Sequence, residues 1–124
     1  MSEDRRRELR RAYRERPTTA GVYQVRNTSN GKVLLGSRLN LDGALNTHRF
    51  MLTHGSHRNA RLQREWNEYG ADAFVFEILA VVQVKDEPGF DLGDELSLLE
   101  QLWLEELKPL GGHGYNESEQ LRQV

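Results

Sequence analysis

Two strand-like segments separated by Asn30-Gly31 constrain the fold of this chain more than any other feature. The first segment, residues 21–27, reads GVYQVRN, and the second, residues 32–36, reads KVLLG. An Asn-Gly pair between such segments is a strong hairpin signal, because a type I′ turn needs positive φ at both central residues. We therefore expect an antiparallel hairpin with a type I′ turn, and with Tyr23 and Val25 on one face.

Helix caps predict the two elements that follow. Asn40 can cap a helix that runs to about His54, and Asn59 can cap a second helix that runs to Tyr69 and ends at Gly70.

Hydrophobic runs predict the rest of the fold. Residues 73–82 are rich in Phe, Val and Ile, which indicates a central, well-buried strand. Residues 91–107 indicate a long helix that Pro109 stops. The order β-β-α-α-β-α predicts an α+β fold, a small three-stranded antiparallel sheet flanked by helices.

Length and composition limit the chain to one modest domain. Its 124 residues, 37% hydrophobic and 29% charged, are ordinary for a globular protein. No stretch has the roughly eighteen apolar residues of a membrane helix, and the lack of cysteine excludes a disulfide framework and a thiolate zinc site. We expect a cytoplasmic protein with no membrane partner, built as an arginine-rich arm (1–18), a domain (19–118) and a tail (119–124).

Charge is divided unevenly along the chain. Residues 1–64 hold 14 Lys and Arg against 5 Asp and Glu, whereas residues 65–124 hold 3 against 14. Such asymmetry suggests a basic surface that could meet a polyanion. Residues 1–16 hold seven of the arginines; they are read more readily as a solvated, partly helical arm than as an extension that tracks DNA phosphates.

A carboxylate interrupts the apolar face of the last helix. At about 100° per residue, Glu100 falls in the middle of an apolar arc made of Leu96, Leu99, Trp103, Leu104 and Leu107. Such a carboxylate must be paired, hydrogen-bonded, protonated or bound to a metal, because its unpaired burial is costly. On its own, a group of this kind is more often structural than catalytic.

The helix expected after Asn40 carries a comparable residue, His48, whose neighbours on one face are Leu41, Ala44, Leu45, Met51 and Leu52. A lone histidine there is more often a satisfied core residue than a catalyst. Two inward-facing ionisable groups in one small domain shift the balance toward a site. His54, His57 and His113 lack the spacing of a zinc motif.

One ordered set of residues extends over positions 21–116. It begins with Gly21-Val22-Tyr23 and Leu34-Leu35-Gly36 and ends with Glu100 and Gly114-Tyr115-Asn116. Between these lie Asn27, Asn30-Gly31-Lys32, Ser37, His48, the stretch 55–59, Leu62-Gln63, Trp66, Tyr69-Gly70 and Phe74. The set resembles the GIY-YIG nuclease family, which implies the α+β fold of that family and cleavage of phosphodiester bonds with one divalent metal ion.

The resemblance also implies roles for four residues. Tyr23 would lie near the attacking water and act in its deprotonation. Glu100 would hold the metal ion, Mg²⁺ or Mn²⁺, which neutralises charge on the phosphate and supports the leaving oxygen. His48 would assist or orient, and Asn116 would close the site.

Two positions depart from the family pattern. Active members carry a tyrosine where this chain has Leu34 and an arginine where it has Ala44. Loss of one preorganised donor commonly costs on the order of a hundred- to a thousandfold in rate. Arg38 and Arg49 are the candidates to supply the missing cation; Arg49 points about 100° away from His48 on the helix, which favours Arg38.

Three functions are open. The first is a metal-dependent DNA endonuclease, either fully active or attenuated. The second, supported about equally, is a catalytically inactive GIY-YIG-fold module that binds DNA or regulates. Both would contact DNA through a basic set: Arg38, Arg49, His57, Arg58 and Arg61. In the inactive module Arg64 would contact phosphates as well. The third, well behind, is a protein-interaction domain that uses the acidic half. A homodimer would make a double-strand cut easier to explain.

Overall fold

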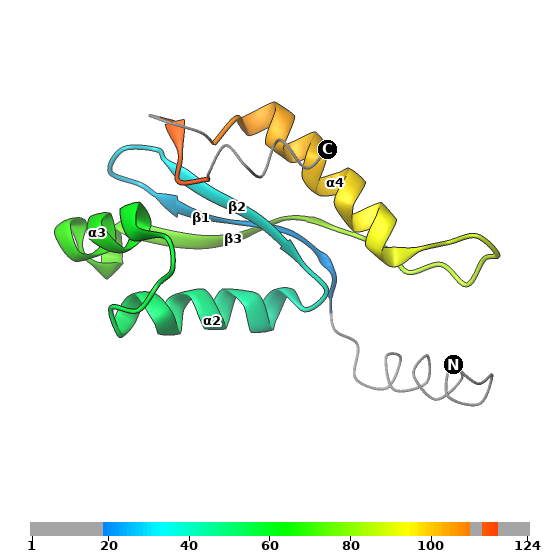
Figure 1. Ribbon diagram of the computed structural model, residues 1–124, viewed down its shortest axis with the longest axis horizontal. Helices are drawn as coiled ribbons and strands as arrows, with labels where there is room; N and C mark the ends of the chain where they lie inside the picture. Colours follow the sequence, from blue (N-terminus) through cyan, green and yellow to red (C-terminus); the bar gives the residue numbers. More distant parts are fainter. Residues whose placement is uncertain (1–18, 110–112, 117–124) are drawn as a thin grey trace.

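The computed structural model describes residues 19–109 and 113–116, in which a three-stranded sheet lies between helices (Figure 1). The strand order is β2-β1-β3, and both outer strands run antiparallel to the central one. The strands are β1 (Gly21–Asn27), β2 (Val33–Arg38) and β3 (Phe74–Val81). The predicted α+β class and element order are confirmed. The predicted arm, 1–18, and tail, 119–124, lie outside the described residues.

The connection between β1 and β2 is not the predicted type I′ turn. Gly31 has a φ of 78°, but Asn30 does not have positive φ. The N–H of Gly31 donates to the carbonyl of Asn27 (2.8 Å), and the N–H of Asn27 donates to the carbonyl of Lys32 (2.9 Å). The side-chain oxygens of Asn27 and Asn30 accept from the backbone N–H of Ser29 and Lys32. These side-chain bonds favour a longer loop over the two-residue turn.

β3 lies at an edge of the sheet, so its predicted central, well-buried position is wrong. Ile78 and Val81 on this strand are 46% and 51% exposed. The central strand is β1, in which all residues except Arg26 are buried. Phe, Val and Ile favour any pleated, half-buried strand, and their abundance therefore does not distinguish an edge from a centre.

Two helices, α2 (Leu41–Thr53) and α3 (Ala60–Tyr69), cover one face of the sheet with the predicted caps. The Asn40 side chain accepts from the N–H of Gly43 (3.0 Å), and the Asn59 side chain accepts from the N–H of Leu62 (3.0 Å). Each amide oxygen satisfies a backbone donor that the first helical turn leaves without a partner. The connection between the two helices brings residues 55–59 back beside α2.

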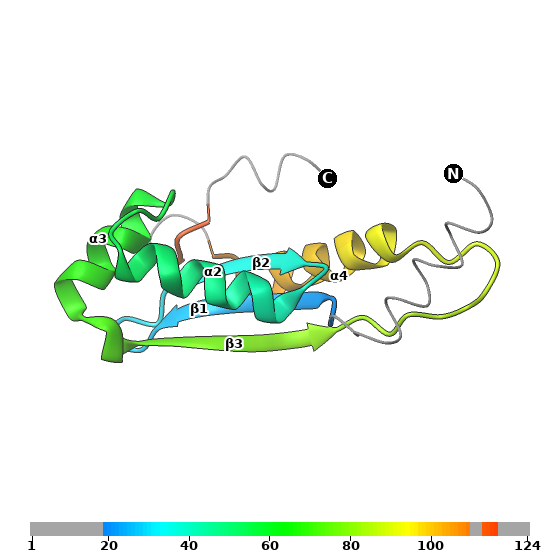
Figure 2. The same ribbon diagram turned by 90° about the horizontal axis from the view of Figure 1, so that it is seen from below.

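The last helix, α4 (Leu92–Leu107), packs on the opposite face of the sheet (Figures 1 and 2). Its apolar arc faces the sheet as predicted: Leu96 and Leu104 are buried, while Leu99, Trp103 and Leu107 pack against Val22 and Leu35. No helix among the described residues is long and apolar enough to cross a membrane.

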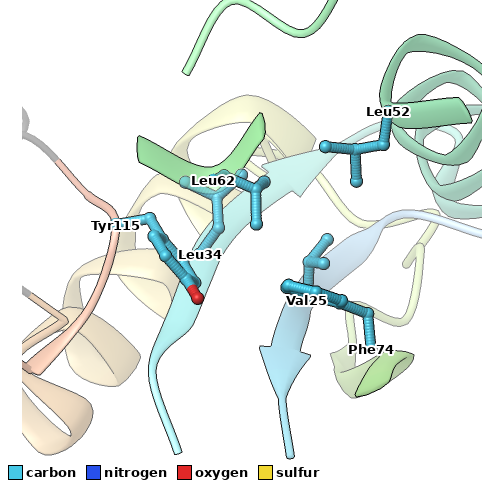
Figure 3. Close-up of a cluster of buried hydrophobic side chains, with 6 residues drawn as sticks. All are labelled: Val25, Leu34, Leu52, Leu62, Phe74 and Tyr115. Atoms are coloured by element: carbon cyan, nitrogen blue, oxygen red, sulfur yellow. The ribbon is translucent and has the colours of Figure 1, made fainter. Parts of the chain in front are cut away.

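One core cluster lies between the sheet and the pair α2 and α3 (Figure 3). Its buried members come from strands, helices and the C-terminal segment: Val25, Leu34, Leu52, Leu62, Phe74 and Tyr115. Paired positions of adjacent strands point to the same side, so Tyr23, Gly36 and Arg38 share this face with Leu34. The face therefore changes from apolar to polar toward the end of β2.

Segment 113–116 covers the outer edge of β2. The N–H of Tyr115 donates to the carbonyl of Val33 (2.9 Å). The Asn116 side chain accepts from the N–H of Leu35 (2.7 Å) and donates to its carbonyl (2.8 Å). The segment thereby satisfies the edge of β2 up to Leu35, and Gly36 follows directly.

Candidate active site

Tyr23 and Gly36 approach each other closely across the pair β1 and β2. Tyr23 is 2% exposed. A Cβ atom at position 36 would lie 2.5 Å from the phenol oxygen and 2.7 Å from the ring carbon that bears it. Because glycine has no side chain, the phenol can lie over β2 instead of over its own strand. The phenol oxygen thus lies beside Gly36, one residue after Leu35, to which the Asn116 side chain bonds.

The phenol oxygen of Tyr23 bonds to His48, which α2 presents from the same face of the sheet. The distance from Oη to Nε2 of His48 is 2.6 Å. The other ring nitrogen of His48, Nδ1, lies 2.8 Å from Nε2 of His57, and the two imidazoles stack at 5.0 Å. Nδ1 of His57 in turn accepts from the backbone N–H of Asn59 (3.0 Å). The structure therefore joins His57, which we expected among the DNA-binding residues, to the Tyr23–His48 pair.

Both histidines are held neutral. Burial first, and then electrostatic interactions with His57, Arg38 and Arg58, lower the pKa of His48 to about 4. Burial and the charge of Arg58 also lower the pKa of His57. At neutral pH each ring consequently carries a single N–H.

Glu100 acts on the phenol electrostatically from the helix on the opposite face of the sheet. It belongs to α4, is half-buried, and its negative charge raises the pKa of Tyr23, although burial of the phenol has the larger effect. Arg38 acts on the same phenol in the opposite sense. The phenol beside the end of β2 is therefore joined to two imidazoles by hydrogen bonds and feels the charges of one carboxylate and one guanidinium.

Two cations flank this group. Arg38 is exposed at the end of β2, where its guanidinium donates to the carbonyl of Ser37 (2.9 Å). Arg58 is exposed beside His57 and acts on both histidines. An anion above the Tyr23–His48 pair would meet a positive charge from β2 and another from the α2–α3 loop.

Known proteins share this fold and much of this sequence. No protein-family model matches the chain. Intron-associated endonuclease 1 of Enterobacteria phage T4 is 32% identical over 97 residues, which are 78% of this chain and 36% of that protein. The solved catalytic domain of homing endonuclease I-TevI is 33% identical, with a TM-score of 0.62, over 78% of this chain and 96% of that domain. A mutant catalytic domain of intron endonuclease I-TevI is 29% identical, with a TM-score of 0.64, over 80% of this chain and 93% of that one.

The chain is a homologue of this endonuclease catalytic domain. It spans only 36% of the length of the phage relative. The match therefore leaves most of that relative without a counterpart in this sequence.

Two residues of the predicted basic set lie apart from the Tyr23–His48 pair in this homologue. The guanidinium of Arg49 lies 4.6 Å from the ring centroid of Phe76, in a groove of about 410 Å³ that Trp66 also lines. Arg61 is half-buried and donates to the carbonyl of Gly114. Arg49 thus stacks on β3, and Arg61 anchors the C-terminal segment.

Asn116 has a structural task. It is 3% exposed, and its amide makes the two bonds to the backbone of Leu35 described above. Through these bonds it fixes the strand immediately before Gly36. Its predicted role of closing the site stays a prediction.

Both departures from the family pattern are visible in the structure. Leu34 is 9% exposed and belongs to the core cluster in Figure 3, and Ala44 is half-buried on α2. Neither side chain can donate a hydrogen bond to an anion, and the cations that act on the histidines are Arg38 and Arg58.

One buried carboxylate escaped the sequence analysis. Glu65 on α3 is 7% exposed, accepts from the side chains of Asn30 (2.5 Å) and Asn27 (3.5 Å), and forms an ion pair with Lys32 (3.5 Å). It thereby ties α3 to the β1–β2 loop. The signal was present, because Glu65 follows Leu62 by three residues and precedes Trp66 on the same helical face.

The residues present fit one divalent ion held mainly by its substrate. The described residues contain no cluster of three or more His, Cys, Asp and Glu side chains that could hold a metal. Mg²⁺ does not need such a cluster, because it usually keeps several waters and uses one or two carboxylates together with substrate phosphates. Glu100 is the carboxylate that lies near the phenol.

Proposed function

We propose that this chain is a metal-dependent DNA endonuclease of the GIY-YIG type. One observation carries the proposal: the phenol of Tyr23 bonds to His48 at 2.6 Å, and the charge of Glu100 raises the pKa of this phenol. The fold that holds these groups is that of an endonuclease catalytic domain. A buried phenol between a neutral imidazole and a carboxylate is costly in a domain of this size. A catalytic task for the group explains why it is there.

The reaction would be hydrolysis of a phosphodiester. Water oriented by Tyr23 and His48 would attack the phosphorus while the bond from phosphorus to the leaving oxygen breaks. The attacking water would lose its proton to solvent, the leaving oxygen would take one from solvent, and Arg38 and Arg58 would bind the nonbridging oxygens. A divalent ion at Glu100, Mg²⁺ or Mn²⁺, would neutralise charge on the phosphate and stabilise the leaving oxygen. Active family members have an arginine at the position of Ala44, and Arg38 would replace its positive charge. Arg38 is suited to this because its charge acts on the phenol of Tyr23 and on His48 from the end of β2.

Plasmid nicking tests this proposal directly. The full chain is incubated with supercoiled plasmid and Mg²⁺ or Mn²⁺, beside the variant Glu100→Ala and a chelator control. Glu106→Ala is the matched control, because Glu106 is an exposed carboxylate on the same helix. We expect nicking by the wild type and by Glu106→Ala, and none by Glu100→Ala or with chelator. Equal nicking by Glu100→Ala would refute the role of this carboxylate.

A second function is favoured by two specific positions. Leu34 is part of the core and Ala44 has no donor, so the site lacks two groups that active family members carry. A catalytically inactive module of the GIY-YIG fold would keep the cations for DNA binding or regulation. Salt-sensitive retention of DNA without nicking would select this function. Absence of DNA binding even at low salt would instead select a protein-interaction domain.

Two further expectations accompany the nuclease proposal. Cutting of both strands would be simplest for a homodimer, which sedimentation at several protein concentrations would detect. A cytoplasmic location is likewise a proposal, and fractionation of cells that express the chain would test it.

A further inference from the structure

Four groups form one continuous line of hydrogen bonds that runs from α3 to β1. The backbone N–H of Asn59 lies 3.0 Å from Nδ1 of His57, and Nε2 of His57 lies 2.8 Å from Nδ1 of His48. Nε2 of His48 then lies 2.6 Å from the phenol oxygen of Tyr23. All three distances are those of hydrogen bonds.

The backbone amide sets the direction of the whole line. An amide N–H can only donate, so Nδ1 of His57 must accept and the hydrogen of this neutral ring must sit on Nε2. That hydrogen points at Nδ1 of His48, which must accept in its turn. His48 therefore carries its hydrogen on Nε2 and donates it to the oxygen of Tyr23.

The first group in the line is firmly held. The Asn59 side chain caps α3 at the N–H of Leu62 (3.0 Å) and donates to the carbonyl of Tyr115 (2.6 Å). The N–H of His57 donates to the side chain of Gln63 (3.0 Å), which is itself buried and bonded to the carbonyl of Leu52 (3.0 Å). These bonds hold the loop, so the ring of His57 cannot turn over without breaking the contact of its Nδ1 with the Asn59 amide.

We propose that His57 is a positioning residue that holds His48 as its Nε2–H tautomer, so that His48 donates to Tyr23 instead of accepting from it. For His48 to accept, its hydrogen would have to sit on Nδ1. It would then meet the hydrogen on Nε2 of His57 across 2.8 Å. Only the donating arrangement lets every group in the line make a bond.

The consequence for catalysis rests on the proposed nuclease function. Because the phenol oxygen of Tyr23 accepts from His48, its own hydrogen points elsewhere and can be donated to an oxygen of a bound phosphodiester or water. Accepting one hydrogen bond strengthens the donation of the other, since successive bonds polarise each other. His48 in this arrangement cannot take the hydrogen of Tyr23, because its Nε2 already carries one.

Nitrogen NMR of the full chain tests the tautomers without any reference to activity. Long-range correlations between ring protons and ¹⁵N nuclei distinguish a protonated ring nitrogen from a bare one. At neutral pH we expect His48 and His57 both to be neutral, with the hydrogen on Nε2. A wild-type His48 with its hydrogen on Nδ1 would overturn the proposal, whether or not any variant folds.

A variant of His57 tests the cause. His57→Phe keeps a flat ring against His48 but removes the donor, so the Nδ1–H tautomer of His48 should appear. His54→Phe is the matched control, because His54 is exposed at the C-cap of α2 and its ring bonds to the carbonyl of Phe50 (2.8 Å), away from the line of hydrogen bonds. An unchanged His48 tautomer in folded His57→Phe would also overturn the proposal.

Activity supplies a separate readout. If the chain nicks DNA, His57→Phe should lower kcat on the order of ten- to a hundredfold with little change in KM, since it misplaces a group without removing a phosphate contact. An equal fall in binding and turnover would indicate that His57 contacts DNA instead. A wild-type chain with the expected tautomers but without nicking would refute the proposed function and leave the positioning role intact.

Discussion

The close approach of the Tyr23 phenol to Gly36 makes Gly36→Ala a quantitative test of the site. An alanine Cβ would lie 2.5 Å from the phenol oxygen, whereas ordinary contact begins at 3.4 Å, so the oxygen must retreat by roughly 0.9 Å. A retreat of that size away from His48 would lengthen the bond of 2.6 Å to about 3.5 Å, which is well outside the usual range of about 2.7–3.2 Å for an N–H···O hydrogen bond and would weaken it greatly. Overpacking of this kind costs about 1–3 kcal/mol in the free energy of unfolding.

Gly31→Ala is the matched control for this substitution. Gly31 has a φ of 78° with nothing within 4 Å of an added Cβ, so alanine there costs about 1 kcal/mol of strain without touching the site. Urea denaturation measures both losses of stability, and the NMR signal of the Nε2 hydrogen of His48 reports the bond to Tyr23. We expect Gly36→Ala to lose that signal and about a hundredfold in nicking rate, while Gly31→Ala keeps both. Wild-type nicking and an undisturbed His48 signal in Gly36→Ala would refute the packing argument.

Three further predictions concern charge and burial. Arg38→Ala should weaken DNA binding and reduce the slope of log affinity against log salt by about 1, whereas Arg49→Ala, whose guanidinium stacks on Phe76, should leave the slope unchanged in filter binding. The pKa of His48 falls from 6.5 in the unfolded chain to about 4 in the folded one, so between these pH values the unfolded chain binds more protons. The free energy of unfolding therefore decreases as pH falls from about 6.5 to about 4. His48 is half-buried, so after solvent screening we expect His48→Gln to recover about 1 kcal/mol of the loss between pH 7 and pH 5 in urea titrations. Equal losses in His48→Gln and the wild type would contradict this assignment. Glu65→Ala should lower the free energy of unfolding by about 2 kcal/mol, because it leaves buried donors without an acceptor, while Glu68→Ala on the exposed side of α3 should change it by less than about 0.5 kcal/mol.

The sequence predicted the starts of α2 and α3 correctly, because a single capping residue determines where each helix begins. Asn40 and Asn59 cap α2 and α3 at the predicted positions, because a cap depends on a single side chain and the next few backbone amides. The turn at Asn30 was predicted less well, since two Asn side chains there bond to the backbone and stabilise a longer loop.

Long-range placement was harder to predict than local structure. The strand order depends on which strand each segment pairs with. The apolar sequence of β3 does not show that it pairs with β1 and lies at an edge of the sheet. The link between His48 and His57 was equally hidden, because nine positions separate them and only the α2–α3 loop brings their rings to 5.0 Å. Helical periodicity can show that a side chain faces inward, but it cannot show which loop meets it.

The position of the Tyr23 phenol explains why residue 36 of β2 is a glycine, since any side chain there would occupy the space of the phenol. His48 belongs to α2 on one face of the sheet and Glu100 belongs to α4 on the other, so a residue of the central strand can reach both only by passing over β2 (Figure 2). Tyr23 does so at Gly36, where no Cβ blocks the ring. Two positions earlier, Leu34 fills the core beneath α3, and two positions later Arg38 is exposed. Along one face, β2 therefore supplies core packing, then room for the phenol, then a cation, and in the proposed function this cation would be the first group of β2 to meet a phosphate at the end of the strand.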